Sequence, residues 1–166
     1  VGGGSSAYGF WSEFMDYDKK QIELIGVEAG GPKSSKLHAA PLTNNAKLGI
    51  LHGAAAYVCQ SNEGQISDTA SISAGLDYPG VSPIHCFLKD TRRARYTSAT
   101  DESALNAYKL VTRLEKINPS LEPSHAFAEA IKIAPKLSKD TIVIVNSCGD
   151  AKKDRDILKA RLGKIN

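Results

Sequence analysis

The sequence predicts an α/β fold in which helices flank a largely parallel sheet. Apolar residues spaced as in amphipathic helices alternate with short runs rich in β-branched residues. A glycine-rich turn, Gly2 to Ala7, stands at the first predicted helix, and the β-branched run Thr141 to Val145 leads into a polar turn. With 166 residues, 42% of them hydrophobic and 23% charged, the chain is long and apolar enough to form a folded domain.

The first half of the chain alternates between a helix, a strand and loops. Ala7 to Tyr17 carries apolar residues at helical spacing, and Ile22 to Val27 is a short apolar run that predicts a buried strand ending at Glu28. Gly30 to Asn45 is rich in glycine, proline and serine, which predicts a loop. Gly49 to Gln60 is mostly apolar and ends at a polar turn, so we expect a hairpin or a short buried element there.

The second half predicts three helices and one strand. Thr100 can cap a helix whose first turn is acidic and whose apolar residues share one face. Ser124 to Lys136 predicts a second helix, and Ile157 to Leu162 a closing one. Between these two, Thr141 to Val145 is expected to form a strand, because β-branched residues favour extended backbone.

Charge and composition argue against several classes of protein. The formal charge of +3 is spread along the chain, apart from the basic stretch Lys152 to Lys164, where interspersed acids favour a solvated helix face over a nucleic-acid site. No apolar run approaches the roughly 20 residues that cross a membrane, so neither a nucleic acid nor a membrane is an expected partner. Three separated cysteines predict no disulfide framework and a reducing, intracellular setting, and the four histidines lack zinc-site spacing.

The glycine-rich turn is open to four interpretations. Glycines let backbone N–H groups approach an anion, and Ser5 and Ser6 add hydroxyl donors, which suits a phosphomonoester. The same residues satisfy the pattern G-x-G-x-x-A, and with Glu28 about twenty residues further on they match a dinucleotide-binding fingerprint. Gly3 to Ala7 also approaches the nucleophile elbow of hydrolases, without its last glycine. The plainest interpretation is a tight turn that needs small residues.

Three further polar residues have ordinary structural explanations when each is taken alone. Cys148 follows the last predicted strand, where a small side chain could reach a ligand or could simply end the strand. Glu122 precedes a proline at a helix start, where an acid meets the helix dipole. Asp77 lies between turn glycines and a proline, which is typical of a turn residue that bonds its own backbone.

Five motifs follow one another along the chain: Val1-Gly2-Gly3-Gly4-Ser5, Leu24-Ile25-Gly26-Val27-Glu28, Ile72-Ser73-Ala74-Gly75-Leu76-Asp77-Tyr78-Pro79-Gly80-Val81, Leu121-Glu122-Pro123-Ser124-His125-Ala126 and Val143-Ile144-Val145-Asn146. The series resembles the C-terminal part of the tryptophan synthase β chain, a fold-type II pyridoxal-phosphate enzyme. The resemblance covers essentially the whole chain and is most specific from Ser73 to Val81. It implies that residues 1–166 form an incomplete three-layer α/β domain, without the N-terminal domain, that holds the cofactor phosphate.

The resemblance also implies an activity and a role for each matching position. The intact enzyme would be a lyase that replaces the hydroxyl of L-serine with indole, giving L-tryptophan and water. Glu122 would lie beside the ring of pyridoxal 5′-phosphate and help direct the replacement, and Asp77 would contact the serine hydroxyl. Cys148 would contact the pyridine nitrogen, where the family commonly has serine, a stronger hydrogen-bonding group. The implied cofactor-binding residues are Gly2, Gly3, Gly4, Ser5, Ser6 and Cys148.

Two further groups of residues follow from the resemblance. Leu51 and His52 fall where the family lines its indole tunnel. Four backbone carbonyls fall where it binds a monovalent cation, K⁺ or Na⁺: those near Gly2, Leu76, Tyr78 and Gly80. The chain departs from the family at Ser6, where asparagine is usual, and over residues 150–154, where the family has a more glycine-rich run.

The resemblance places other parts of the machinery outside this sequence. The Schiff-base lysine and the loop that binds the substrate carboxylate belong to the family's N-terminal portion, and no lysine here lies in a matching motif, so we expect this fragment alone to be catalytically silent. The expected partners of the intact enzyme are a second β chain and the indole-producing α chain, in the cytoplasm or, with a transit peptide, in a plastid. Two alternatives are a non-catalytic binding or regulatory relic of the fold and a dinucleotide-binding domain.

Overall fold

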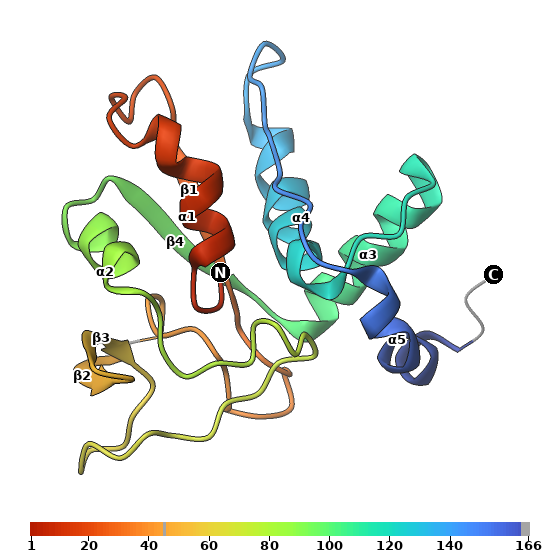
Figure 1. Ribbon diagram of the computed structural model, residues 1–166. Coiled ribbons are helices and arrows are strands. Elements are labelled where there is room, and N and C mark those ends of the chain that lie inside the picture. Colours follow the sequence, from red (N-terminus) through yellow and green to blue (C-terminus); the bar gives the residue numbers. More distant parts are fainter. Residues whose placement is uncertain (45, 164–166) are drawn as a thin grey trace.

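The computed structural model describes residues 1–44 and 46–163, which form a mixed α/β structure (Figure 1). Asn45 and Lys164, the last residues of two predicted segments, lie outside the described residues. Short 3₁₀ turns follow α1 and α4 and precede α5, at Ser12–Phe14, Ala134–Lys136 and Ala151–Asp154. The helices and strands are α1 (Ser5–Trp11), β1 (Leu24–Ala29), β2 (Lys47–Leu51), β3 (Ala54–Val58), α2 (Pro83–Asp90), β4 (Ala94–Ala99), α3 (Asp101–Glu115), α4 (Leu121–Ile133) and α5 (Arg155–Leu162).

The described strands form two small sheets. β1 pairs in parallel with β4, in unbroken register from Leu24 to Ala29. β2 and β3 form an antiparallel hairpin, as the sequence predicts for this stretch. In the turn between them His52 and Gly53 have φ angles of 51° and 79°, the positive pair that a two-residue hairpin turn requires. The mixed class and the parallel pairing are as predicted, but each described sheet is two strands wide.

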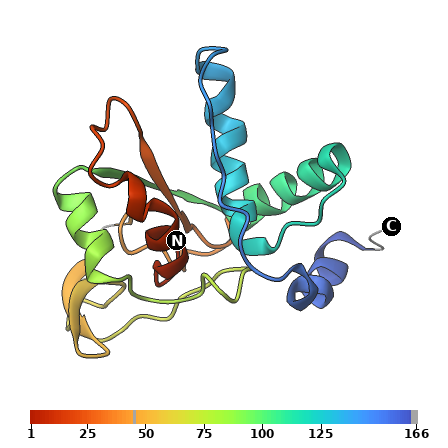
Figure 2. The same cartoon turned by 45° about the horizontal axis from the view of Figure 1, so that its top comes forward.

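Helices flank the β1–β4 pair. α4 contacts both strands, α3 packs along α4, and α2 contacts β3 and β4. In both views the hairpin and α2 lie on one side of the molecule, and α3, α4 and α5 lie on the other (Figures 1 and 2). One core cluster joins Trp11 of α1 to Leu24 and Leu88, and another joins Leu121 of α4 to Leu158 of α5. These clusters hold α1 and α4, whose N-terminal ends carry most of the predicted site.

The starts of α3 and α4 follow from local chemistry. Thr100 caps α3, because its Oγ1 accepts a hydrogen bond from the amide of Ser103 at 3.3 Å, and two acids follow in the first turn, as predicted. α4 begins at Leu121, earlier than predicted. Pro123 fits inside its first turn because that position needs no intrahelical N–H. Glu122 is therefore a first-turn acid of α4.

The strand predicted over Thr141 to Val145 is wrong. The segment has no regular secondary structure and runs back along α4 in both views (Figures 1 and 2). Its apolar side chains are exposed, with Ile142 at 84% and Ile144 at 69%. β-Branched residues favour extended backbone, but a strand also needs a neighbour to bond, and no described strand pairs with this segment.

The other predicted elements are present with shifted ends. α1 starts at Ser5 and gives way to the 3₁₀ turn after Trp11, instead of continuing to Tyr17. The strand expected from Ile22 begins at Leu24, and the closing helix is α5. α2 and β4 were not predicted.

Two findings bear on the classes that composition argues against. Within residues 1–44 and 46–163, the helices are too short or too polar to cross a bilayer. Cys59, Cys86 and Cys148 carry free thiols.

Candidate functional site

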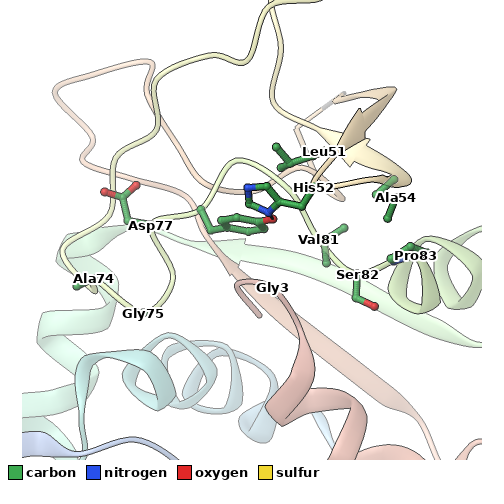
Figure 3. Close-up of a pocket in the computed structure, with 12 residues that line it drawn as sticks. Gly3, Leu51, His52, Ala54, Ala74, Gly75, Asp77, Val81, Ser82 and Pro83 are labelled. Atoms are coloured by element: carbon green, nitrogen blue, oxygen red, sulfur yellow. Dashed lines mark hydrogen bonds between the residues drawn. The ribbon is translucent and has the colours of Figure 1, made fainter.

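The predicted site residues line two adjoining hollows. The larger, a groove of about 1280 Å³, runs between α1, β1, α4 and the segment that follows α4. The smaller, a cavity of about 490 Å³, lies between the hairpin and the loop before α2 (Figure 3). Gly3 and Gly75 border both hollows. The groove is lined by the predicted cofactor residues Gly2, Gly3, Gly4, Ser5, Ser6 and Cys148 and by Glu122, and the cavity by Asp77, Leu51 and His52.

In the glycine turn, Gly2 to Ala7, backbone amides are unpaired among the described residues, whereas two carbonyls accept hydrogen bonds. The Gly3 carbonyl accepts a hydrogen bond from the amide of Ser82 at 2.9 Å, and the Gly4 carbonyl accepts one from the amide of Tyr8 at 2.9 Å. Within the described part of the chain, the amides of Gly2 to Ser6 donate to no other group. A Cβ on Gly3 would meet nothing within 4 Å, so the turn faces open space. Unpaired N–H groups around an open space fit a phosphate.

Glu122 is held ionised at the edge of the groove. Its Oε2 accepts a hydrogen bond from Ser120 Oγ at 2.6 Å, and its Oε1 pairs with Lys153 Nζ at 2.5 Å. Burial of the side chain, which is 11% exposed, raises the pKa of this carboxyl, but the ion pair with Lys153 and the Ser120 hydroxyl outweigh burial and lower the pKa to about 2. A Cβ on Gly75 would lie 2.3 Å from Oε1, so a larger residue there would displace the Glu122 carboxylate.

The segment after α4 reaches the groove although it is not a strand. The Cys148 carbonyl lies 2.9 Å from Ser120 Oγ, so the same serine links this segment to Glu122. Asn146 Nδ2 donates to Ser6 Oγ at 3.2 Å, which joins the segment to the glycine turn. The Cys148 side chain is half-buried and borders the groove. Position and accessibility both suit contact with a ligand lying between the turn and Glu122.

Asp77 and the hairpin lie at opposite ends of the smaller cavity. Figure 3 shows Asp77 with Ala74 and Gly75 at one end, and Leu51, His52 and Ala54 at the other. Asp77 is exposed, and among the described residues its carboxylate accepts no hydrogen bond, so the carboxylate is free to meet a ligand. The walls between are mostly small and apolar: Ala54, Ala56, Ala74, Val81 and Pro83. Such walls fit a flat apolar ring.

The structure brings only some of the residues implied for a monovalent cation close together. Gly2 packs against the Gly75 carbonyl, which a Cβ on Gly2 would approach to 2.7 Å. The Leu76 carbonyl already accepts a hydrogen bond from the amide of Tyr78 at 2.9 Å, and Gly80 bridges to Val58 of β3. In the part of the chain that the structure describes, no three His, Cys, Asp or Glu side chains cluster as metal ligands. The cation site stays a prediction.

Comparison with known proteins gives relatives that share one description, three of which illustrate the match. The tryptophan synthase beta chain of Rhodopseudomonas palustris is 47% identical over 163 residues, which is 98% of this chain and 40% of the relative. Those of Allorhizobium ampelinum and Chromobacterium violaceum are 50% and 48% identical over 155 residues, 93% of this chain and 37% and 38% of the relatives. The chain is a homologue of part of the tryptophan synthase β chain. It spans about two fifths of the length of the relatives it matches, and no family model matches it.

The homology to the β chain fits the geometry better than the alternatives that the glycine turn left open. Glu28, the acid expected to hold a ribose, is completely buried, and both its oxygens accept the Leu42 amide at 3.0 and 3.1 Å. Thr43 Oγ1 donates to the same carboxylate at 2.8 Å, so Glu28 faces inward. His85, the histidine that contacts the turn, uses both ring nitrogens elsewhere and is not free to activate a serine. The turn supports neither a dinucleotide site nor a hydrolase elbow.

Four residues of this β-chain homologue's site escaped prediction. His85 and Tyr96 lie behind the glycine turn, and Lys153 and Ser120 position Glu122. Histidine spacing alone does not single out His85, and Lys153 falls both in the basic stretch Lys152 to Lys164 and in residues 150–154, where the chain departs from the family pattern. His52 also differs from expectation, because its Nδ1 lies 3.0 Å from the Tyr78 hydroxyl, making a polar pair in an otherwise apolar cavity.

Proposed function

We propose that this chain is the cofactor-phosphate domain of a tryptophan synthase β chain, corresponding to its C-terminal portion and belonging to a three-layer, largely parallel fold-type II enzyme. The observation that carries the proposal is the groove, where the glycine turn, Glu122 and Cys148 converge from distant parts of the sequence. Identity near 48% over almost the whole chain supports the same conclusion. The domain assignment covers residues 1–166.

Different residues of the groove would contact different parts of pyridoxal 5′-phosphate. The amides of Gly2 to Ser6 and the Ser5 hydroxyl would hold the phosphate, and the ionised Glu122 would lie beside the ring. The Cys148 thiol would contact the ring nitrogen as a weak hydrogen-bonding group. When bound, the cofactor supplies an electron sink for carbanion chemistry.

The neighbouring cavity serves the two substrates of the intact enzyme. Asp77 offers a free carboxylate to the hydroxyl of L-serine, and the apolar walls near Leu51 and His52 admit indole. The product is L-tryptophan, formed by β-replacement with loss of water. Serine, indole, a second β chain and the α chain are the partners we propose, with a monovalent cation near Leu76 and a cytoplasmic location.

We propose further that residues 1–166 alone do not make tryptophan. The relatives are about two and a half times as long as the region they share with this chain. The family resemblance implies that the lysine that holds the cofactor's aldehyde belongs to the unmatched portion. Detection of tryptophan from serine, indole and pyridoxal 5′-phosphate with this chain alone would overturn that part.

The phosphate site is tested with a ligand that cannot react with lysines. Titration calorimetry with pyridoxine 5′-phosphate is expected to show binding that inorganic phosphate competes away, with no binding of pyridoxine or NAD. Ser5→Ala is expected to weaken the binding about tenfold, because a hydrogen bond to a charged group is lost. Ser12→Ala, which changes a serine at the end of the same helix bonded only to the Gly9 carbonyl, should leave it unchanged. Binding of NAD without any response to pyridoxine 5′-phosphate would refute the proposal.

A further inference from the structure

His85 stands directly behind the glycine turn. It belongs to α2, is completely buried, and packs edge-on against Trp11 with ring centroids 5.4 Å apart. Its Nε2 lies 2.8 Å from the Gly4 carbonyl and its Nδ1 lies 2.7 Å from the Tyr96 hydroxyl. The ring therefore joins the turn to β4.

These two contacts permit one arrangement of protons in the neutral ring. A carbonyl oxygen can only accept, so Nε2 must carry the hydrogen that it donates to Gly4. In the neutral ring Nδ1 then accepts, and the Tyr96 hydroxyl donates to it. Burial lowers the pKa of His85 below its ordinary value, which favours this neutral form. The Gly4 carbonyl thus selects the tautomer, and the Tyr96 hydroxyl supports it by donating to Nδ1.

Holding the carbonyls fixes where the next amides point. In a trans peptide the C=O and the following N–H point in opposite directions, and residues 1–44 and 46–163 contain no cis peptide bond. The Gly3 and Gly4 carbonyls point back toward the Ser82 amide and His85. The amides of Gly4 and Ser5 consequently point the other way, toward the groove, which neither Ser82 nor His85 lines.

We propose that His85 is a positioning residue for anion binding: it donates to the Gly4 carbonyl, directs the Ser5 amide at the ligand's phosphate, and is supported in this tautomer by the Tyr96 hydroxyl. The inference rests on the proposed function of the turn. The chain of donors from Tyr96 through His85 to the Gly4–Ser5 peptide also polarises that amide, because linked hydrogen bonds strengthen one another. The ring occupies the place of a side chain at position 4, since a Cβ on Gly4 would lie 2.2 Å from it.

The test compares three variants of this chain. His85→Phe keeps a flat ring without a donor, and His85→Gln restores an N–H near the position of Nε2. Leu88→Ala is the matched control, because Leu88 is buried in the same helix and packs with Trp11 without touching the turn. Each is titrated with pyridoxine 5′-phosphate at a temperature where circular dichroism shows it folded, and the ¹⁵N–¹H shift of the Ser5 amide is recorded.

We expect His85→Phe to bind at least about fivefold more weakly and to shift the Ser5 amide, since one hydrogen bond is lost. His85→Gln should return to within about twofold of the wild type, and Leu88→Ala should match it in both readouts. Unchanged affinity and an unchanged Ser5 amide in His85→Phe would overturn the inference. So would equal weakening in His85→Phe and Leu88→Ala without recovery in His85→Gln, since that pattern marks a purely structural role.

Two further arms keep the test decisive. If His85→Phe does not fold, Tyr96→Phe replaces it, with a smaller loss of affinity and a displaced Ser5 amide expected; wild-type values in both would refute the role of the pair. If the wild type itself does not bind pyridoxine 5′-phosphate, the proposed function fails. The change in the Ser5 amide shift in His85→Phe then still tests whether His85 positions the turn. An unchanged Ser5 amide shift refutes the inference independently of the proposed function.

Discussion

Lowering the pH from 7 to 5 should remove the contribution to folding stability of His125, a completely buried residue in the first half of α4. Its Nδ1 donates to the Leu121 carbonyl at 2.8 Å, and its Nε2 has no partner among the described residues. Burial lowers the pKa of His125 from 6.5 to about 4, against the opposing effect of the Leu121 carbonyl. A proton on Nε2 would be a buried donor with nothing to bond.

The sign and size follow from proton linkage. Between pH 6.5 and 4 the unfolded chain binds a proton at this histidine and the folded chain does not, so folding stability falls as the pH falls. Stability from His125 is complete above pH 6.5 and is lost progressively below it. Integration between the two pKa values gives a loss of about 2 kcal/mol between pH 7 and 5.

Urea unfolding at pH 7 and 5 measures this loss, with circular dichroism and tryptophan fluorescence as two probes of one transition. His125→Asn keeps a donor near the position of Nδ1 but does not titrate, so its stability should fall by about 2 kcal/mol less than that of the wild type. Ser124→Ala is the control, because Ser124 is equally buried and bonds the Ser120 carbonyl without titrating. If the wild type and His125→Asn show the same pH dependence, the burial argument fails.

Three other predictions use the same chain. Burial raises the pKa of Glu28 to about 7, so the contribution of this carboxyl to folding stability falls by up to about 3 kcal/mol as the pH rises from 4.5 through 7, opposite in sign to that of His125. Glu28→Gln should remove this contribution from the pH dependence of urea unfolding, and a variant with the same pH dependence as the wild type would contradict this. Gly4→Ala should lower the free energy of unfolding by at least about 2 kcal/mol, because Gly4 has a φ of 98° and a Cβ there would clash with His85. Gly9→Ala, on the open surface of the same helix, should raise it by about 0.5–1 kcal/mol. Thermal unfolding compares the two variants, and similar effects would argue against the contact with His85. Lys153→Met should raise the pKa of Glu122 from about 2 towards its ordinary 4.5, followed by ¹³C NMR of the carboxyl, and a constant pKa would mean that the ion pair does not hold Glu122 ionised.

Elements whose causes lie within a few residues could be predicted from the sequence. Thr100 caps α3 because a hydroxyl meets an amide three residues later in the same turn. The hairpin forms because His52 and Gly53 accept positive φ between two apolar runs. The motifs around Gly2, Asp77 and Glu122 also pointed to residues that line the two hollows, because a motif can be recognised from its sequence spacing alone.

Contacts between distant segments could not be predicted in this way. Thr141 to Val145 has every local property of a strand, but strand formation depends on a neighbour that local pattern does not encode. His85 meets the Gly4 carbonyl across 81 positions, and Lys153 meets Glu122 across 31. Each of these side chains would suit an ordinary helix surface by composition alone.

The sequence by itself determined the start of α3, allowed a hairpin near Gly49 to Gln60 and pointed to the residues proposed to bind a phosphate, because backbone preference and side-chain chemistry act over a few neighbours. Tertiary structure alone decided the state of those residues. Burial keeps Glu28 turned inward and away from any ligand, the Lys153 contact keeps Glu122 ionised, and His85 turns the amide of Ser5 toward the groove. These outcomes depend on solvent exclusion and on charges brought together by folding, which arise only when remote segments pack.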